Sequence, residues 1–281
     1  MSDRIAVIGA GQMGNGIAHV FAQSGFSVVM IDISEGALAK GRDAIVKNLD
    51  RQIKHGTLAA EERPAILARL GTHTSMEAVR GAALVVEAAT ENRDLKFRIF
   101  AELDRHSDAG AVLASNTSSI SITEIAARTV RPERVIGMHF MNPVPLMQLI
   151  EIIRGLATSD ETTSRVVAWG AAVGKTTVEV NDYPGFVANR LLMPMINEAV
   201  FCLMEGVGSA EAIDTVMKLG MKHPMGPLAL ADLIGLDTCL AIMEVLQSGL
   251  GDAKYRPCPL LRKYVAAGWL GRKSGRGFYT Y

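Results

Sequence analysis

Gly9-Ala10-Gly11-Gln12-Met13-Gly14 is the stretch that decides the fold of the N-terminal part of this chain. It is a GxGxxG motif that follows an apolar run typical of a buried strand, residues 4–9, and begins a helical pattern. The first glycine makes the tight turn, the second lets the backbone approach a pyrophosphate, and the third allows close helix–strand packing. The helix N-terminus then faces the phosphates. We predict dinucleotide contacts at Gly9, Gly11, Gln12, Met13 and Gly14.

A carboxylate at the end of the second predicted strand indicates which dinucleotide is bound. Asp32 follows the apolar run at residues 27–31, about twenty residues beyond the glycine motif. A carboxylate in this position accepts hydrogen bonds from an adenosine ribose and repels a 2′-phosphate. The sequence therefore favours NAD over NADP. A coincidental turn, or a site for a nucleotide-like ligand such as S-adenosylmethionine, is the alternative.

Short β-branched runs alternate with helical patterns over the first two-thirds of the chain, and after residue 182 the strand patterns end. Such alternation predicts βαβ units and a mostly parallel sheet. We predict strands at 4–9, 27–31, 83–88, 111–115, 134–139, 148–153 and 176–180, and later helices at about 186–205, 209–219, 227–247 and 259–267.

These patterns predict an α/β fold followed by an all-α domain. We expect a Rossmann-like domain over residues 1–182, with a helical pair inserted at about 34–70. The helical domain then occupies residues 183–281.

The 281 residues carry 29 lysines and arginines against 29 aspartates and glutamates, which argues against a strongly basic nucleic-acid binder. The most apolar stretch, residues 225–246, contains Asp232 and Asp237 and fits a buried helix better than a membrane span. The first apolar run begins at Ile5, which leaves no room for a signal peptide. Three dispersed cysteines without a CxxC argue against a zinc site and fit a reducing compartment. We expect a cytoplasmic protein without nucleic-acid or membrane partners and without a bound metal.

Two residues in neighbouring predicted strands have the chemistry of a general base and its partner. His139 closes the strand at 134–139, and Glu151 interrupts the apolar strand at 148–153. Ligands gather at the carboxyl ends of strands in open α/β sheets, and a carboxylate in an apolar strand needs a partner. A carboxylate fixes the tautomer of a paired histidine and stabilises its cationic form. Either residue could instead be an ordinary buried group in a structural network.

Polar side chains also follow the strand at 111–115 and begin the helical domain. Ser115-Asn116-Thr117-Ser118-Ser119 supplies hydroxyls and an amide near the same sheet edge, although a polar loop with a helix N-cap explains it equally well. Asn189 lies in the first turn of the next helix, where it faces the expected interdomain cleft. It could contact a ligand there or make a structural hydrogen bond.

Taken together, these stretches resemble the 3-hydroxyacyl-CoA dehydrogenase family, and within it most closely the bacterial 3-hydroxybutyryl-CoA dehydrogenases. The similarity covers essentially the whole chain. Its best stretches are GAGQMGNGIA at 9–18, VVEAATEN at 85–92, ASNTSSISITEIA at 114–126, VIGMHFMNPVP at 135–145, PGFVANRLL at 184–192, MKLGMKHPMGP at 217–227 and GWLGRKSGRGFYTY at 268–281.

The resemblance implies a reversible oxidation of (S)-3-hydroxyacyl-CoA by NAD that needs no metal, with a short acyl chain. It implies that His139 is the general base and that Glu151 orients it. Ser118 would then hydrogen-bond the reacting oxygen, and Asn189 would hold the substrate carbonyl. Further implied NAD contacts are Glu91, Lys96, Asn116, Ser118, Asn142 and Lys273.

The resemblance also implies that the inserted helices bind the CoA arm of the substrate. The face formed by Lys47, Arg51 and Lys54, which would otherwise be an ordinary solvated surface, then meets phosphates. The match is poor here, because Asn48 and His55 stand where some relatives have serine and lysine. The implied CoA contacts are Asn48, from the aligned positions, and Arg51 and Lys54, from the basic face.

The helical domain is implied to close the substrate cleft and to form a homodimer interface. Two other functions stay open. The chain could be an NAD-dependent dehydrogenase of a hydroxy acid without CoA, or a non-catalytic NAD-sensing protein on the same fold.

Overall fold

The computed structural model describes residues 3–281, which divide into two compact units. The first unit ends at Asp182 and the second begins at Tyr183. Each unit encloses a hydrophobic core of its own. None of the helices within residues 3–281 combines the length and the apolar character needed to cross a membrane.

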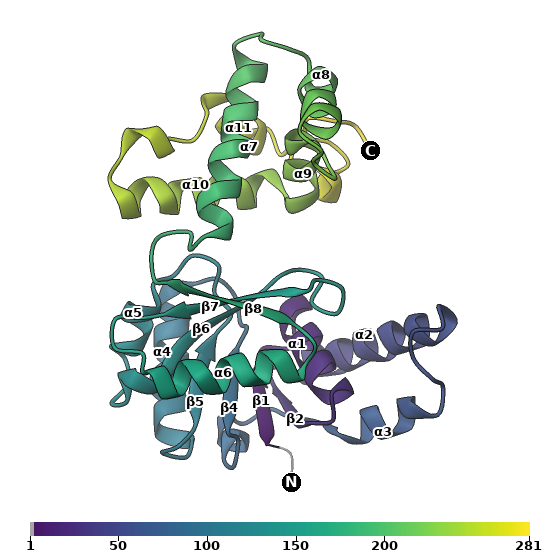
Figure 1. Ribbon diagram of the computed structural model, residues 1–281, viewed down its shortest axis with the longest axis vertical. Helices are drawn as coiled ribbons and strands as arrows, with labels where there is room; N and C mark the ends of the chain where they lie inside the picture. Colours follow the sequence, from purple (N-terminus) through teal and green to yellow (C-terminus); the bar gives the residue numbers. More distant parts are fainter. Residues whose placement is uncertain (1–2) are drawn as a thin grey trace. The chain divides into compact units, whose positions relative to one another are not determined.

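In the N-terminal unit, eight strands from the described residues form one sheet in the order β3-β2-β1-β4-β5-β6-β7-β8 (Figure 1). Neighbouring strands are parallel except for β6 and β7, which are antiparallel. The prediction of a Rossmann-like, mostly parallel sheet is therefore confirmed. The strands are β1 Arg4–Ile8, β2 Ser27–Ile31, β3 Leu70–His73, β4 Leu84–Glu87, β5 Val112–Ser115, β6 Val135–Phe140, β7 Leu149–Arg154 and β8 Thr176–Asn181.

The central strands are buried because helices cover both faces of the sheet. In β4, β5 and β6 every residue is buried, and β1 and β2 are buried beyond their first residue. α1 packs against β1 and β2, α5 against β6, and α6 against β6, β7 and β8. The helices of this unit are α1 Gln12–Gln23, α2 Glu35–Lys54, α3 Glu62–Ala68, α4 Arg93–His106, α5 Ile122–Ala126 and α6 Asp160–Ala172.

One strand of the sheet was not predicted. β3 pairs in parallel with β2 at the edge of the sheet, and only Leu70 of its four residues is buried. Gly71 and Thr72 interrupt any apolar run, so the sequence pattern carries no strand signal here. The strand forms because β2 offers an unpaired edge and the helical insertion returns the chain beside it.

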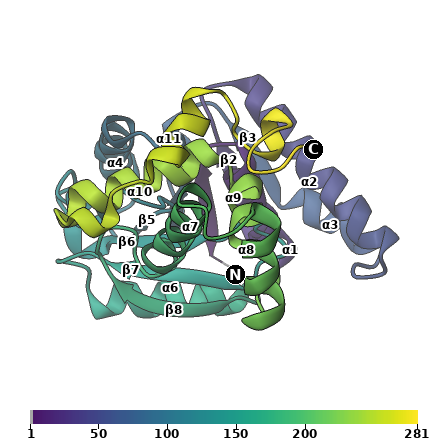
Figure 2. The same cartoon turned by 90° about the horizontal axis from the view of Figure 1, so that it is seen from above.

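The inserted segment forms two helices, α2 and α3, which extend beyond α1 in both views (Figures 1 and 2). Ser34 caps α2, since its Oγ accepts a hydrogen bond from a backbone N–H in the first turn. Leu38, Ile45 and Leu49 are buried along one face of α2. Pro64 lies in the first turn of α3, where the missing N–H of a proline is tolerated.

The C-terminal unit is helical, and α7 is contacted by α8, α9, α10 and α11. The prediction of a single helix at 227–247 is wrong. The chain forms two helices here, α9 and α10, which are separated at Gly235. Gly235 has a φ of 103°, which glycine adopts readily and which no α-helix continues through. The helices are α7 Ala188–Met204, α8 Ala210–Thr215, α9 Pro227–Ile234, α10 Leu236–Leu250 and α11 Pro259–Ala266, with a π-helical turn at Val216–Gly220.

Two buried aspartates fasten the last residues of the chain to this unit. Asp232 accepts hydrogen bonds from the backbone N–H groups of Phe278 and Tyr279 at 3.0 and 2.9 Å. Asp214 accepts from the backbone N–H of Leu228 at 2.9 Å and from the hydroxyl of Tyr279 at 2.8 Å. Buried carboxylates satisfied in this way do not require a cation.

His19 is a fully buried histidine on the inner face of α1. Burial lowers the pKa of His19 to about 4, and the charge of Lys175 acts in the same direction. Lys175 is itself buried and donates to the carbonyl oxygens of Val144 and Met147 at 2.8 and 2.7 Å. Desolvation lowers the pKa of Lys175 as well. The folded unit therefore holds His19 in its neutral form at neutral pH.

We expect His19→Leu to reduce the acid sensitivity of folding. Because the pKa of His19 is about 4 in the folded chain and 6.5 ordinarily, the unfolded chain binds the proton first as the pH falls. The wild type should lose about 2 kcal/mol of stability from this group between pH 7.5 and pH 5. Urea unfolding at the two pH values measures the loss. His55→Leu, at an exposed position, is the control and should behave as the wild type. An equal loss in wild type and His19→Leu would contradict the expectation.

Candidate functional site

His139 and Glu151 lie directly opposite each other on β6 and β7. Opposite residues of an antiparallel pair project their side chains on the same face of the sheet. His139 Nδ1 and Glu151 Oε2 are 2.8 Å apart, and both residues are buried. A carboxylate that accepts the Nδ1 proton leaves Nε2 as the basic nitrogen. The structure thus brings the predicted pair together, while its catalytic role stays a prediction.

Ser118 completes a line of hydrogen-bonding groups with this pair. Its Oγ lies 3.1 Å from His139 Nε2, on the loop that follows β5. The N-cap of α5 is Ser121, which lies outside the polar run at 115–119. Within the run, Thr117 Oγ1 accepts from the backbone N–H of Ile120 at 2.9 Å, so these side chains also hold the loop itself. The three side chains come from three neighbouring strand ends, which fits the rule that ligands bind at this edge of an α/β sheet.

The glycine motif has the geometry that a dinucleotide requires. Gly9 has a φ of 99°, and a Cβ on Gly14 would lie 1.9 Å from the carbonyl oxygen of Gly9. Both positions therefore require glycine. A Cβ on Gly11 would meet nothing within 4 Å among residues 3–281, so the space in front of this residue is open to a ligand. Gly11 is also the N-cap of α1 and has no side chain to cap the first N–H groups, which leaves them for an anion.

Asp32 is held in place at the end of β2. Its Oδ2 accepts a hydrogen bond from the backbone N–H of Ala10 at 2.9 Å, and its Oδ1 accepts from Ser34 at 3.1 Å. The carboxylate is thereby fixed beside the glycine loop, where a ribose would lie. Asp32 and the loop together fit NAD.

Lys96 and Asn116, two further residues predicted to contact NAD, are buried and hydrogen-bonded at this edge of the sheet. Lys96 Nζ lies 2.6 Å from Glu87 Oε1 and 3.4 Å from Glu91 Oε2. Asn116 Oδ1 accepts from the backbone N–H of Phe140 at 2.9 Å, which ties the loop after β5 to the end of β6. Sequence reasoning missed Glu87. The signal was a carboxylate at the end of an apolar run, the same signal that identified Glu151.

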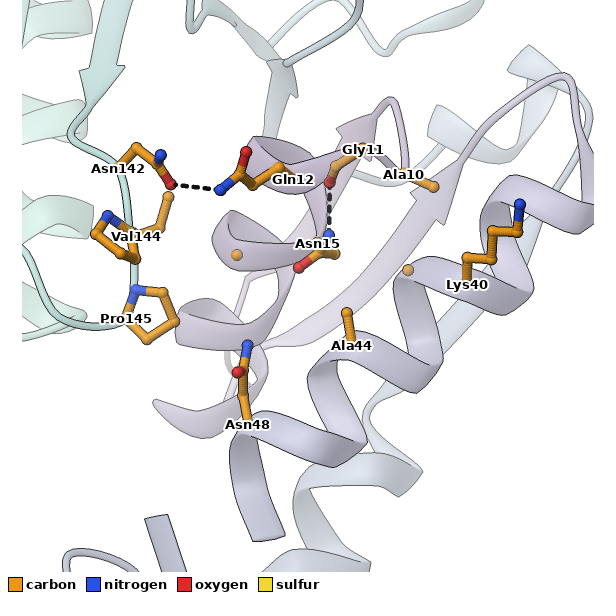
Figure 3. A pocket seen from close by; sticks show the side chains of 13 residues that line it. Ala10, Gly11, Gln12, Asn15, Lys40, Ala44, Asn48, Asn142, Val144 and Pro145 are labelled. Atoms are coloured by element: carbon orange, nitrogen blue, oxygen red, sulfur yellow. Dashed lines mark hydrogen bonds between the residues drawn. The ribbon is translucent and has the colours of Figure 1, made fainter. Parts of the chain in front are cut away.

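A cavity of about 480 Å³ lies between α1, α2 and the loop at 142–145 (Figure 3). It brings together Gln12, Asn142 and Asn48, and Gln12 Nε2 donates to Asn142 Oδ1 at 3.1 Å. Lys40, which sequence reasoning missed, lines the same cavity from α2. Arg51 Nη1 lies 3.4 Å from Asn48 Oδ1. Residues predicted to bind NAD and CoA thus line one cavity.

The last three predicted site residues are Asn189 and Lys273 of the C-terminal unit and Lys54 of the N-terminal unit. Asn189 lies in the first turn of α7 and is buried. Lys273 forms an ion pair with Asp237, with Nζ and Oδ1 2.6 Å apart. Lys54 lies in the last turn of α2 and is exposed. The ligand contacts predicted for these three residues stay predictions.

Comparison with known proteins identifies relatives that match the whole chain. Residues 4–183 match the NAD binding domain of 3-hydroxyacyl-CoA dehydrogenase, and residues 185–281 match the C-terminal domain of the same family. The chain is 60% identical over 278 residues to a probable 3-hydroxybutyryl-CoA dehydrogenase of Bacillus subtilis, covering 99% of this chain and 97% of the relative. It is 55% identical to the 3-hydroxybutyryl-CoA dehydrogenase of Bradyrhizobium diazoefficiens, covering 99% and 95%. The crystal structure of (S)-3-hydroxybutyryl-CoA dehydrogenase from Ralstonia eutropha matches with a TM-score of 0.98 at 52% identity, covering 100% of this chain and 99% of that chain.

We expect Gly11→Ala to weaken NAD binding and Gly14→Ala to lower stability, because, of these two glycines, only Gly14 is packed against the protein backbone. Gly11→Ala should keep stability within about 0.5 kcal/mol and weaken NAD binding about tenfold, because the added methyl occupies only ligand space. Gly14→Ala should destabilise the N-terminal unit by about 2 kcal/mol, because its methyl collides with the backbone at Gly9. Chemical unfolding and calorimetric titration with NAD measure the two effects. Equal stability losses in the two variants would contradict this assignment.

Proposed function

Because the chain belongs to the 3-hydroxyacyl-CoA dehydrogenase family, we propose that it interconverts (S)-3-hydroxybutyryl-CoA and acetoacetyl-CoA, with His139 as the general base. The observation that carries the chemical part of this proposal is the line Ser118–His139–Glu151, with separations of 3.1 and 2.8 Å. The short acyl chain is supported by the names of the relatives that match along almost the whole chain.

His139 moves the proton in this mechanism. In the oxidative direction Nε2 accepts the proton of the 3-hydroxyl group, and Glu151 Oε2 stabilises the imidazolium that forms. In the reductive direction the imidazolium returns that proton to the oxygen on C3. Bound NAD supplies the acceptor for the hydride that leaves C3. The burial of His139 and Glu151 keeps water from competing for the hydrogen bond between them.

Ser118 and Asn189 orient the oxygens of the substrate in this proposal. The Ser118 hydroxyl lies beside Nε2, so it can donate to the reacting oxygen that Nε2 deprotonates. The amide of Asn189 would donate to the substrate carbonyl. Glu91, Lys96, Asn116, Asn142 and Lys273 are the further proposed NAD contacts.

The CoA arm is proposed to lie along α2. Arg51 and Lys54 are exposed on this helix, and Asn48 lines the cavity beside the glycine loop. Guanidinium and ammonium groups form charge-assisted hydrogen bonds with phosphates. This arrangement supports a phosphate-binding face beside the cavity, because Arg51 Nη1 lies 3.4 Å from Asn48 Oδ1.

We further propose that the chain forms a homodimer through its C-terminal unit and works in the cytoplasm. Large apolar side chains are exposed on this unit, and exposed apolar patches mark interaction sites. The exposed apolar side chains of this unit include Leu191, Val216, Leu219 and Met221. The three cysteines of the chain are free thiols, which fits a reducing compartment.

The substrate is tested by following NADH consumption with acetoacetyl-CoA, with free acetoacetate and with no substrate. We expect consumption with acetoacetyl-CoA alone, because the free acid lacks the CoA arm that α2 would bind. Equal rates with free acetoacetate would favour a dehydrogenase of hydroxy acids without CoA. A flat trace with both substrates would favour an NAD-sensing protein and overturn the proposal.

We expect His139→Gln to lower kcat by about 10²–10⁴-fold while the fold and the affinity for NAD are kept. The amide can still meet Glu151 but cannot take up a proton at the position of Nε2. Steady-state kinetics, calorimetry with NAD and circular dichroism measure the three properties. His106→Gln, on α4, is the matched control and should keep kcat. Wild-type turnover of His139→Gln would remove His139 from the mechanism.

A further inference from the structure

Glu87 is a fully buried carboxylate that the proposed mechanism does not use. It is the last residue of β4, in the centre of the sheet. Its Oε1 accepts from Lys96 Nζ at 2.6 Å and from the backbone N–H of Ala89 at 2.7 Å. Its Oε2 accepts from Ser115 Oγ at 2.7 Å. Glu87 thus joins β4, β5 and α4 at the edge of the sheet where the candidate site lies.

The contacts of Glu87 continue to Ser118 through one further carboxylate. Lys96 Nζ lies 3.4 Å from Glu91 Oε2. Glu91 Oε1 accepts from the backbone N–H of Ser118 at 2.9 Å and from Ser119 Oγ at 3.0 Å. Ser118 Oγ then lies 3.1 Å from His139 Nε2. A continuous chain of polar contacts therefore runs from Glu87 to the proposed general base.

The positions of the charged side chains along these contacts explain how Glu87 supports Ser118. Lys96 is a buried cation placed between two carboxylates, and the shorter distance is to Glu87. If a neutral residue replaced Glu87, Glu91 would be the remaining anionic partner of Lys96 within this chain of contacts. The ammonium would then draw Glu91 towards itself, away from the N–H of Ser118. Buried ion pairs add little net stability over apolar residues of equal volume, so stability alone accounts poorly for this arrangement.

We propose that Glu87 is a positioning residue, which holds Lys96 and thereby leaves Glu91 to fix Ser118 against His139. This inference rests on the proposed function of Ser118 and His139. The Glu87 side chain is hydrogen-bonded to Lys96, Ala89 and Ser115. Its effect on the reaction is transmitted by Lys96, by Glu91 and by the backbone of the loop after β5.

A double-mutant cycle between Glu87→Gln and Ser118→Ala tests this proposal. We expect Glu87→Gln to lower kcat about tenfold and to leave the KM for acetoacetyl-CoA within about twofold, because it misaligns a group near the reacting oxygen. In the Ser118→Ala background the same substitution should change kcat less than about twofold, because the group that it positions is gone. An equal tenfold loss in both backgrounds would overturn the proposal. Wild-type turnover of Ser118→Ala would overturn it together with the proposed role of Ser118.

Asp104→Asn provides a control for the loss of an ion-paired carboxylate. Asp104 Oδ1 pairs with Arg131 Nε at 2.7 Å, about two turns further along α4 than Lys96. This substitution should lower the melting temperature but leave kcat unchanged. If Asp104→Asn lowered kcat as much as Glu87→Gln does, the effect would be general destabilisation and the proposal would fail.

A measurement without substrate or NAD separates this inference from the proposed function. The nitrogen resonances of His139 report on its contact with Ser118 Oγ, whatever reaction the protein catalyses. Glu87→Gln should shift the Nε2 resonance, and Asp104→Asn should leave it unchanged. An unshifted resonance in Glu87→Gln would overturn the proposal even if the dehydrogenase activity were established.

Ser115→Ala keeps the test possible if Glu87→Gln does not fold. It removes the hydroxyl that donates to Glu87 Oε2 and accepts a longer hydrogen bond, 3.3 Å, from the backbone N–H of Thr117, and it leaves the charge of Glu87 in place. We expect a loss of about threefold in kcat, which disappears in the Ser118→Ala background. A loss that persisted there would count against the proposal.

Discussion

The antiparallel pairing of β6 with β7 is the constraint on which the candidate site depends. The connection between them, residues 141–148, is too short for a helical crossover, so the chain must turn back beside the strand it has just left. This reversal sets His139 opposite Glu151 and joins them by a 2.8 Å contact. In a parallel arrangement the register of the two strands would be set by a distant crossover. The same short connection carries Asn142 to the wall of the cavity beside the glycine loop.

The loop that carries Ser118 is held by two buried charges, Glu87 and Lys96, and by the exposed carboxylate of Glu91. Glu87, Lys96 and Glu91 link the ends of β4 and β5 to the first turn of α4. A buried charge is tolerated only when it is paired and hydrogen-bonded, so each member of this network restricts where the others can lie. The loop that carries Ser118 is consequently held by a carboxylate, although it lies at the surface of the sheet edge.

Local features must attract the polyanionic ligands of this family, because the chain has no net charge. The uncapped N-terminus of α1 offers N–H groups and a positive dipole end to phosphates. Two side chains of α2 add positive charge here. Lys40 lines the cavity, and Arg51 lies next to Asn48, which also lines it. Exposed charges act only within about 10 Å at moderate salt, so these groups order ligands near the site more than they steer them from afar.

The sequence by itself determined most of the N-terminal architecture, since the glycine motif and the apolar runs are local patterns that can be recognised without the fold. It also indicated His139 and Glu151, because a carboxylate within an apolar strand demands a partner. It could not reveal β3, whose residues lack an apolar pattern, or the break at Gly235, where a positive φ interrupts an apolar helix. Only the tertiary structure decided the chain of contacts from Glu87 to Ser118 and the cavity shared by α1 and α2. Both arise from residues far apart in sequence, and which distant groups meet is set by strand order and packing.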